Sequence, residues 1–447
     1  MIKQEAIKEL LKKGIIPTTD NLNNLKKDAT TNVEILKNFK YEPHKIKVRE
    51  FMETNRAKYS IMRNLLMNRS ELNGAVSISR ISQMNEKKVT IIGMVFEIKK
   101  LPTGTYRLVV EDLSGRITAI VSKNDPELIK KISFVTHDEV IGLIGSYVRD
   151  VFFIKDIVWP GVPQKQIPTY SDDIYVAFLA DIHLGSNVFL EKEFEKAIDW
   201  IAGKHGNEKQ KEIASKIKYI LIIGDIVDGV GVYPHQDNEL NIKDIYEQYE
   251  ALGKYLAQIP KDKHIIISAG THDGVRIEDP KPKLPENLAK PLHDLSNVIF
   301  VTNPALINLH RTKDYPGISV MMYHGDSFDY YVNNVEGLRL LGGYDKPDEI
   351  HKYLLKRRSL SPDYKGLEQL PIKENPLIFQ TVPDVLATGH IHKLAIGNYH
   401  GVITIAASCF QARTSYQEKL GHHPDPGKVV LLNLKNLKAT VMDFLEK

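Results

Sequence analysis

The sequence predicts an α/β protein: a layered α/β domain with central sheets, preceded by a small β-barrel and a short helical N-terminal region. Strands and helices alternate from about residue 173 to the C-terminus, which is typical of layered α/β domains. Between residues 87 and 162, three strand-like segments, one helix and two further strands follow one another, the order of an OB-fold barrel. Residues 3–13 have apolar side chains at helical spacing.

A chain of 447 residues exceeds the size of one ordinary domain. The predicted parts are an N-terminal helical segment with a flexible linker (1–70), an OB-fold domain (71–165) and the α/β domain (166–447). In the first part, residues 51–68 are expected to form a second helix. Residues 17–50 are rich in Asn, Lys and Thr, which indicates a flexible linker.

Composition and charge exclude several classes of protein. With 42% hydrophobic and 26% charged residues the chain is typical of soluble globular proteins, and no apolar run approaches the length of a membrane span. The N-terminus lacks the apolar region of a signal peptide. The single cysteine, Cys409, cannot form an internal disulfide, so we expect a cytoplasmic protein. A net charge of +4 is too small to indicate nucleic-acid binding by itself.

The predicted barrel has two possible uses. OB-folds commonly bind single-stranded nucleic acid through aromatic and basic side chains, and here the candidates are Tyr106, Arg107, Lys99 and Lys100. The alternative is a module that docks another protein. Aromatic residues are sparse in this segment, so composition leaves both uses open.

In the α/β domain, five predicted strands each run directly into polar residues that can bind a metal. Ligand sites of α/β sheets lie at the C-terminal ends of strands, where segments far apart in sequence can meet. A single such motif is weak evidence, whereas five in order are hard to attribute to core packing. The residues are Asp181 and His183 after strand 174–180, Asp225 after 219–223, Thr271, His272 and Asp273 after 264–268, His324 after 318–323, and His390 and His392 after 382–387.

These residue types indicate the kind of metal. Imidazole and carboxylate together suit Mn, Fe, Zn or Ni better than Ca or Mg, and no cysteine lies in the five motifs. Two pairs of histidines and Asp225, which can bridge, suggest two metal ions rather than one. Two such ions, roughly 3.5–4 Å apart, lower the pKa of a bridging water and hold a phosphate for in-line attack.

Taken together, the motifs resemble those of the calcineurin-like metallophosphoesterases. The chain is similar in more detail to the small subunits of archaeal family D DNA polymerases, from about residue 87 to the C-terminus. The segments that carry this second resemblance are Asp181-Ile-His-Leu-Gly-Ser186, Gly224-Asp-Ile-Val-Asp-Gly-Val-Gly-Val-Tyr-Pro234, Tyr323-His-Gly-Asp-Ser-Phe328 and Leu354-Leu-Lys-Arg-Arg358, together with the preceding OB-fold.

The resemblance implies a calcineurin-like fold with two divalent metals, most often manganese, with Fe, Zn, Ni or Mg as the other choices. It implies a first metal held by Asp181, His183, Asp225 and His392, and a second held by Asp225, residue 271, His324 and His390. His272 would be the general acid or would stabilise the phosphate, oriented by Asp273. The implied activity is a 3′→5′ exonuclease on single-stranded or mismatched 3′ ends of DNA. The implied partner is a separate large catalytic subunit that carries the polymerase.

One position departs from the family pattern. The family has Asn in Gly-Asn-His-Asp, whereas this chain has Thr271, whose neutral hydroxyl is shorter and a poorer ligand. A second metal site weakened in this way leaves open a structural scaffold for the polymerase subunit as the alternative function. The metal motifs alone would also permit a phosphodiesterase for a small substrate.

Several other residues carry two readings. Asp228 caps the turn after Asp225 or supports a metal ligand from behind. Arg276 binds a substrate phosphate or pairs with Glu278 or Asp279. The remaining expectations are a basic run at Lys356, Arg357 and Arg358 that meets the DNA backbone or solvent, surface histidines at 235 and 310, a buried Cys409, and Gln411 and Arg413 near the cleft.

Overall fold

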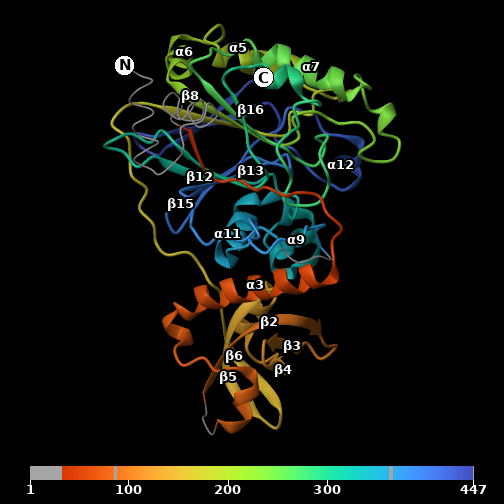
Figure 1. Ribbon diagram of the computed structural model, residues 1–447, viewed down its shortest axis with the longest axis vertical. Helices are drawn as coiled ribbons and strands as arrows, with labels where there is room; N and C mark the ends of the chain where they lie inside the picture. Colours follow the sequence, from red (N-terminus) through yellow and green to blue (C-terminus); the bar gives the residue numbers. More distant parts are fainter. Residues whose placement is uncertain (1–32, 85–87, 362–365, 446–447) are drawn as a thin grey trace.

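The computed structural model describes residues 33–84, 88–361 and 366–445 and has two parts, a barrel and a larger α/β domain (Figure 1). The helix predicted at residues 3–13 lies outside the described residues. None of the described helices has the length and apolar composition that a membrane span requires.

The barrel has the strand order expected of an OB-fold, β2-β3-β4-β6-β5, and is closed. Ile91, Leu108 and Leu143 are among the side chains that fill its interior. The elements are β2 (Val89–Lys100), β3 (Tyr106–Asp112), β4 (Gly115–Val121), α4 (Pro126–Ile132), β5 (Val140–Val148) and β6 (Val151–Val158). The predicted second helix is present as α3 (Val48–Met67), followed by the short 3₁₀ helices η1 (Ser70–Leu72) and η2 (Ile78–Gln83).

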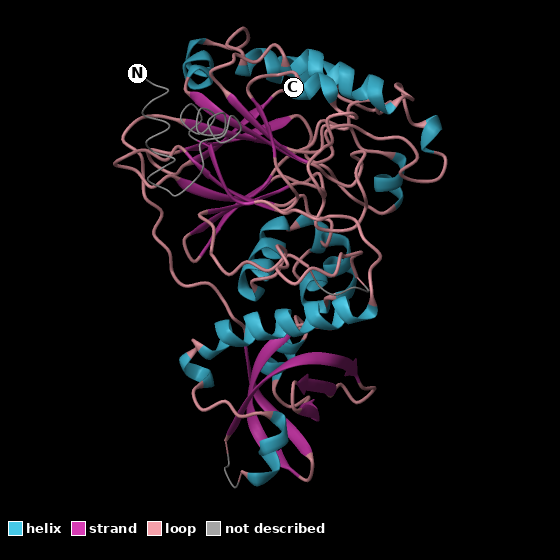
Figure 2. Cartoon of the chain, in the orientation of Figure 1, coloured by secondary structure: helices cyan, strands magenta, loops and turns pink. Residues whose placement is uncertain are grey.

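The α/β domain contains two six-stranded sheets, stacked face to face (Figure 2). The first has the order β1-β11-β12-β13-β15-β14 and the second β10-β9-β8-β7-β16-β17. The strands are β1 (Val33–Lys37), β7 (Tyr175–Leu179), β8 (Ile217–Ile223), β9 (His264–Ser268), β10 (Val298–Phe300), β11 (Ala305–Leu309), β12 (Ile318–Met322), β13 (Val385–Thr388), β14 (Ala395–Tyr399), β15 (Val402–Ala406), β16 (Lys428–Asn433) and β17 (Ala439–Asp443).

Helices cover the outer face of each sheet, which explains the runs of apolar residues in the central strands. Phe194, Trp200 and Leu252 are among the helical side chains that pack on the second sheet, and Tyr331 and Leu354 pack on the first. The helices on the second sheet are α5 (Glu191–Ile201), α6 (Glu208–Ser215), α7 (Ile245–Leu256) and α8 (Lys290–His293), and those on the first are α9 (Phe328–Asn334), α10 (Glu336–Leu340) and α11 (Pro347–Arg357). The other short helices are η3 (Gln236–Asn238), η4 (Gly343–Asp345) and α12 (Ser415–Lys419). The layered α/β fold with central sheets is therefore confirmed.

The predicted linker is wrong at its C-terminal half, because β1 is a strand of the first sheet. It pairs antiparallel with β11, with Val33 opposite Leu309 and Ile35 opposite Ile307. Val33 and Ile35 alternate with Glu34, so one face of this short strand joins the core between the sheets. Three apolar residues, Val33, Ile35 and Leu36, in a region rich in Asn, Lys and Thr give too weak a pattern to predict a strand whose stability comes from its partner.

The basic run at the end of α11 lies at the junction between the two parts and not on a solvated face. Arg357 and Arg358 are buried, and Arg357 Nε lies 2.6 Å from Oε1 of the buried Glu139 in the barrel. Trp159 Nε1 donates to the same oxygen, 2.6 Å away, and the Lys356 ammonium lies 4.0 Å from the centre of the Trp159 indole. Neither a DNA-backbone contact nor full solvation describes these residues.

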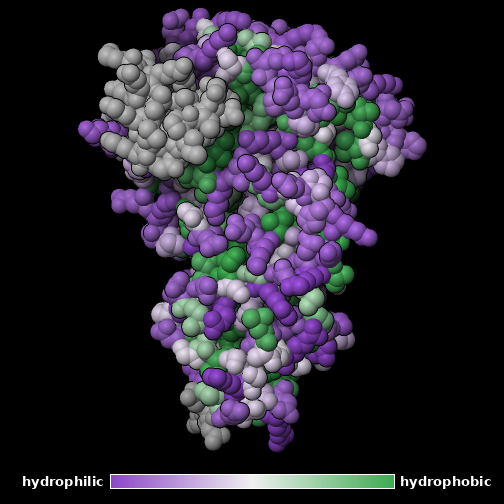
Figure 3. All heavy atoms as spheres, viewed as in Figure 1, coloured by the Kyte–Doolittle hydropathy of each residue, from purple (hydrophilic) through white to green (hydrophobic). Residues whose placement is uncertain are grey.

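Two of the barrel residues considered for nucleic-acid binding also contact the α/β domain. Tyr106 Oη and Lys100 Nζ both donate to the carboxylate of Glu336 in α10, at 2.6 and 2.8 Å. On the face seen in Figure 3, which is largely hydrophilic, hydrophobic side chains are visible at the narrow junction above the barrel. The barrel is therefore at least in part a docking module within this chain. The domain boundaries at residues 70 and 165 remain predictions.

The buried Arg357–Glu139 pair gives a test of this junction. Burial raises the pKa of Glu139 even beside Arg357, so the carboxylate depends on its partner. We expect Arg357→Met to lower the free energy of unfolding by about 3–5 kcal/mol, because it leaves a buried charge uncompensated. Arg357→Met with Glu139→Gln should recover a large part of this loss in urea unfolding followed by circular dichroism. Arg339→Met, at an exposed arginine of α10, is the control. Equal losses in the single and double variants would contradict the pairing.

Candidate metal centre

The five predicted motifs meet at one end of the two sheets. β7, β8 and β9 are parallel neighbours in one sheet, and β12 and β13 are parallel neighbours in the other. Each motif follows the C-terminal end of its strand, so its side chains reach the edge where both sheets end. The convergence expected from the sequence is therefore present.

The backbone at this edge is strained. Asp181 and His183 have φ of 51°, Asp225 has 48°, His390 has 76° and His392 has 54°. Residues other than glycine adopt this left-handed region at a cost of order 1–3 kcal/mol each, and such residues cluster at functional sites. Five such residues are candidate ligands. The loops are therefore shaped to direct these side chains toward one place, at the expense of backbone strain.

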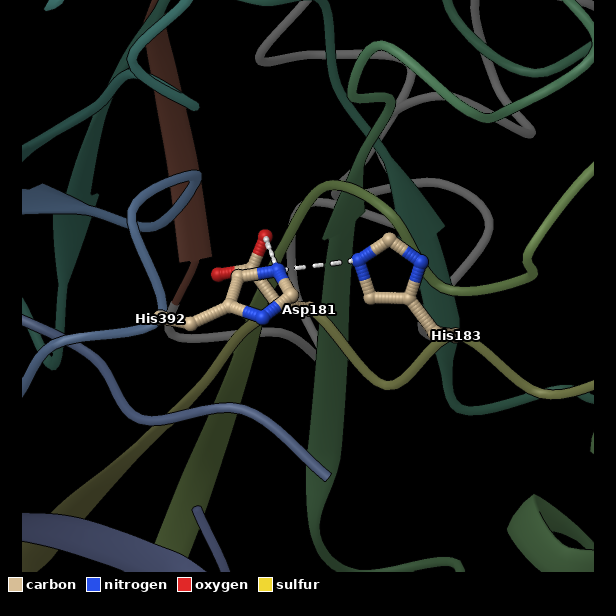
Figure 4. Close-up of side chains that lie close together, drawn as sticks. All are labelled: Asp181, His183 and His392. Carbon is tan, nitrogen blue, oxygen red and sulfur yellow. Dashed lines mark hydrogen bonds and ion pairs between the residues drawn. The ribbon is translucent and has the colours of Figure 1, made fainter. Parts of the chain in front are cut away.

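Asp181, His183 and His392 form the first cluster, and one donor atom of each lies within 4.8 Å of the others (Figure 4). His183 Nε2 lies 3.1 Å from His392 Nε2, and His392 Nε2 lies 3.7 Å from Asp181 Oδ1. All three residues are buried. The close approach of two ring nitrogens and a carboxylate oxygen away from water suits a shared cation.

Asp225, His324 and His390 form the second cluster by the same criterion. His324 Nδ1 donates to the carbonyl of Ile223 at 2.9 Å, so Nε2 is the ring nitrogen that a metal could bind in place of a proton. Without a metal, burial acts to lower the pKa of His324, but Asp225 outweighs burial and raises that pKa well above its usual value. This Nε2 is buried, lies 3.1 Å from Asp225 Oδ2, and receives no well-aligned hydrogen bond from any described residue. A buried nitrogen left in this state fits a metal ligand.

Asp225 lies between the two clusters. Its Oδ2 is 3.1 Å from His324 Nε2 in the second cluster and 3.8 Å from His183 Nε2 in the first. Thr271 Oγ1 donates to the same oxygen at 3.0 Å, and the backbone N–H of His272 donates to Oδ1 at 2.7 Å. The position is that of a bridging carboxylate, and the Thr271 hydroxyl occupies the place where a longer side chain could reach a metal.

The electrostatics of the centre reflect crowding of charged groups in a buried site. Burial raises the pKa of Asp181 to about 6, with the neighbouring Asp225 carboxylate adding to the effect. Burial also acts to raise the pKa of Asp225, but His324 and His272 outweigh it and hold that pKa well below its usual range. A divalent cation among these groups would stabilise both carboxylates as anions.

Each candidate histidine is held from behind through its other ring nitrogen, as metal-binding histidines commonly are. His183 Nδ1 lies 2.9 Å from Asp228 Oδ1, and His390 Nε2 lies 3.0 Å from Asp329 Oδ2. His392 Nδ1 lies 3.0 Å from the side-chain amide of Gln417. Of the two roles predicted for Asp228, the structure therefore favours the one in which Asp228 orients a candidate metal ligand. Asp329 and Gln417 were missed because they lie in helices α9 and α12, outside any motif.

The structure differs from the expectation that Asp273 orients His272. His272 Nδ1 donates to the backbone carbonyl of Asp228 at 2.7 Å. The Asp273 carboxylate instead accepts the N–H groups of Gly270, at 2.7 Å, and Ile226, at 3.2 Å. Asp273 therefore holds the loops that carry the ligands, and the main chain orients His272. Burial raises the pKa of Asp273 to about 7 and lowers that of His272.

Arg276 is not brought to the site. Its guanidinium lies 5.8 and 5.4 Å from the ring centres of Phe39 and Tyr41, and it donates to the carbonyl of Pro280. It therefore anchors the segment between β1 and α3. The expected pairing with Glu278 or Asp279 is replaced by these contacts.

The expectations for two further histidines and for the cysteine have mixed outcomes. His310 is buried and lies 2.8 Å, Nδ1 to Oη, from Tyr219, so its assignment to the surface was wrong. His235 is exposed and Cys409 is buried, as expected.

A cleft of about 560 Å³ opens beside both clusters. Gln411 lines it and donates to Asp228 Oδ1 at 3.0 Å, whereas Arg413 is not among its lining residues. The other lining residues that matter for the chemistry are His183, Asp225, Thr271, His272, His390 and His392, joined by Tyr233, Tyr344, Tyr416 and His422. The centre is therefore accessible to a substrate.

Comparisons with known proteins agree with this geometry. Residues 174–394 match the calcineurin-like phosphoesterase family, a range that includes every candidate ligand. The chain is 37% identical over 380 residues to the DNA polymerase II small subunit of Methanothermobacter thermautotrophicus, which covers 84% of this chain and 76% of that protein. It is 40% identical over 344 residues to that of Archaeoglobus fulgidus, with coverages of 77% and 67%. For the Methanocaldococcus jannaschii small subunit the identity is 39% over 352 residues, and the match covers 78% of this chain but only 57% of that protein.

Asp228 offers a test of the centre that leaves every candidate ligand in place. We expect Asp228→Asn to weaken binding of Mn²⁺ by about 10- to 100-fold, because the amide no longer supports His183 with a negative charge. Isothermal titration calorimetry measures the affinity. Asp237→Asn, at an exposed aspartate of η3, is the matched control. Unchanged affinity in Asp228→Asn would show that the His183–Asp228 contact has no part in metal binding.

Proposed function

The chain belongs to the family of archaeal DNA polymerase II small subunits, and on this basis we propose that it is a two-metal-dependent 3′→5′ DNA exonuclease that serves a separate large polymerase subunit. The observation that carries the proposal is the pair of buried His/Asp clusters that share Asp225 beside an open cleft. We propose manganese as the metal, with Fe, Zn, Ni or Mg as other choices for this donor set.

The proposed ligands follow the two clusters. Asp181, His183, Asp225 and His392 would hold one metal, and Asp225, His324 and His390, with Thr271 beside them, would hold the other. When bound, such a metal pair activates water and neutralises the charge of a phosphodiester. The fit rests on the donor set, on the buried His324 Nε2 beside Asp225 and on the outer partners that fix each ring.

His272 is the proposed proton carrier or phosphate-binding residue. Because Nδ1 is committed to the Asp228 carbonyl, Nε2 is the nitrogen that remains to exchange a proton with the substrate. Its ring lies near the first cluster, with its centre 4.6 Å from that of His183. A proton given at Nε2 to the leaving oxygen, or a hydrogen bond to a phosphoryl oxygen, are the two roles that this position permits.

Thr271 favours a second candidate function, a structural scaffold for the large subunit. Its hydroxyl is bonded to Asp225, and it is shorter than the asparagine of the family pattern. The barrel, joined to the α/β domain by Glu139 and Glu336, would suit such a role. A structural scaffold would not need the other candidate ligands and their outer partners, yet this chain retains them all. The exonuclease is therefore the better supported of the two.

The exonuclease proposal is tested by removing the carboxylate that the two clusters share and, separately, one histidine of the second cluster. Asp225→Ala and His390→Ala should each reduce Mn²⁺-dependent degradation of single-stranded DNA by on the order of 100-fold or more, because each removes a ligand of the metal pair. His205→Ala, at an exposed histidine beyond α5, is the control and should retain wild-type activity. Activity that survives both ligand substitutions would refute the site. Faster turnover of a small phosphodiester than of DNA would refute the substrate.

Position 271 separates the two candidate functions. We expect Thr271→Asn to raise Mn²⁺ affinity or exonuclease rate, by ~10-fold, because the amide oxygen can reach a metal that the hydroxyl holds weakly. Thr271→Val, which keeps the shape and removes the oxygen, should show no such gain. Measurements of rate against Mn²⁺ concentration distinguish the variants. Identical metal dependence for Thr, Asn and Val would mean that residue 271 is not a ligand.

A further inference from the structure

The cleft beside the candidate metals has a rim of aromatic side chains, formed by Tyr233, Tyr344, Tyr416 and His422. None of the four belongs to the metal motifs. Tyr344, Tyr233 and His422 are partly exposed, and Tyr416 exposes 66% of its surface. Exposed aromatic rings gathered around an open site, and not in a core, indicate a binding surface.

One side of this aromatic rim is connected to the second cluster. Tyr344 Oη donates to Asp329 Oδ1 at 2.8 Å, and the other oxygen of Asp329 lies 3.0 Å from His390 Nε2. The Tyr344 and His422 rings lie against each other, with centres 4.3 Å apart and planes inclined at 45°. This aromatic pair therefore begins one carboxylate away from a candidate metal ligand.

The other aromatic residues are fixed close to the first cluster. The Tyr233 ring centre is 6.2 Å from that of His272, and its hydroxyl donates to Glu239 at 2.9 Å. Tyr416 precedes Gln417 in α12, the residue that holds His392. The aromatic rim thus borders the metal centre through elements that also position its ligands.

The hydrogen bonds of the rim define what it can recognise. The O–H groups of Tyr233 and Tyr344 both donate to carboxylates of this chain, so these residues offer a ligand their ring faces and no free O–H donor. Ring faces stack on any nucleobase, whereas base identity is read through hydrogen bonds to the base edges. A base inside a duplex has both faces covered by its neighbours, and a paired terminal base is held to its partner strand with only its outer face free, so an unpaired base is the better ligand for these rings.

We infer that the aromatic rim, with Tyr344 and His422 as its main surface, stacks the unpaired 3′-terminal base and so selects DNA ends that are frayed, whatever their sequence. This inference rests on the proposed exonuclease function and adds the residues that distinguish an unpaired end from a paired one. Discrimination then comes from base stacking outside the metal centre.

Binding and cleavage are measured with two oligonucleotides that differ only at the 3′ end, one with a normal base and one with an abasic residue. Fluorescence anisotropy in EDTA reports binding without cleavage, and KM in Mn²⁺ reports binding during turnover. For the wild type, the abasic end should weaken binding by ~10-fold, the scale of one base–aromatic stack. In Tyr344→Leu and in His422→Leu the normal end should bind as weakly as the abasic one. The loss of affinity from the leucine substitution and the loss from the abasic end should therefore not add.

Tyr344→Phe keeps the ring and loses the bond to Asp329, so it should retain the preference for the normal base. Tyr246→Leu, at an exposed tyrosine of α7 outside the cleft, is the control and should behave as wild type. Tyr416→Leu tests the same aromatic rim at a position too exposed to affect folding, with a smaller loss expected.

Additive effects of the abasic end and the leucine substitutions would overturn the inference, as would equal wild-type binding of both oligonucleotides in EDTA. A base-dependent affinity without any cleavage would refute the exonuclease function and leave the stacking surface supported.

Discussion

Two buried carboxylates, Asp181 and Asp225, lie within 4.0 and 3.1 Å of the same buried nitrogen, His324 Nε2. Two buried carboxylates that face the same nitrogen require compensating positive charge. Much of the structure around them serves that requirement. Strained loops hold the side chains, the main chain and Asp273 fix the loops, and a second set of residues fixes each imidazole. Divalent cations, which the calcineurin-like phosphoesterase fold binds, would supply such charge.

The sequence predicts that these candidate ligands lie together because the pattern that brings them together is local. Each ligand follows a short apolar strand, and parallel strands bring their C-terminal ends together whatever lies between them in the chain. The OB-fold barrel can be predicted from the sequence equally well, because its strands and single helix occur in uninterrupted order. What the sequence does not predict depends on contacts between distant residues: β1 needs β11 to form, and Arg357 is buried because the barrel brings Glu139 to it.

The same distinction explains the errors around the site itself. Arg276 follows His272 closely, yet its loop turns it toward Phe39 and Tyr41 and away from the cleft. Asp273 is adjacent to His272 but bonds to backbone N–H groups across the sheet edge. Asp329, Gln417 and the aromatic rim come from helices and loops with no metal-binding pattern. Position along the chain identifies the candidate ligands, while their hydrogen-bond partners and the aromatic rim of the cleft emerge only from the three-dimensional arrangement.

The central claim is that this end of the two sheets holds two metals bridged by Asp225. Anomalous diffraction from crystals of the protein soaked in Mn²⁺ measures it directly. We expect two peaks roughly 3.5–4 Å apart, one beside Asp181, His183 and His392 and the other beside His324 and His390, with Asp225 between them. The second peak should be weaker, because Thr271 replaces a stronger ligand. No peak at this edge, or a single peak that does not contact Asp225, would contradict the account.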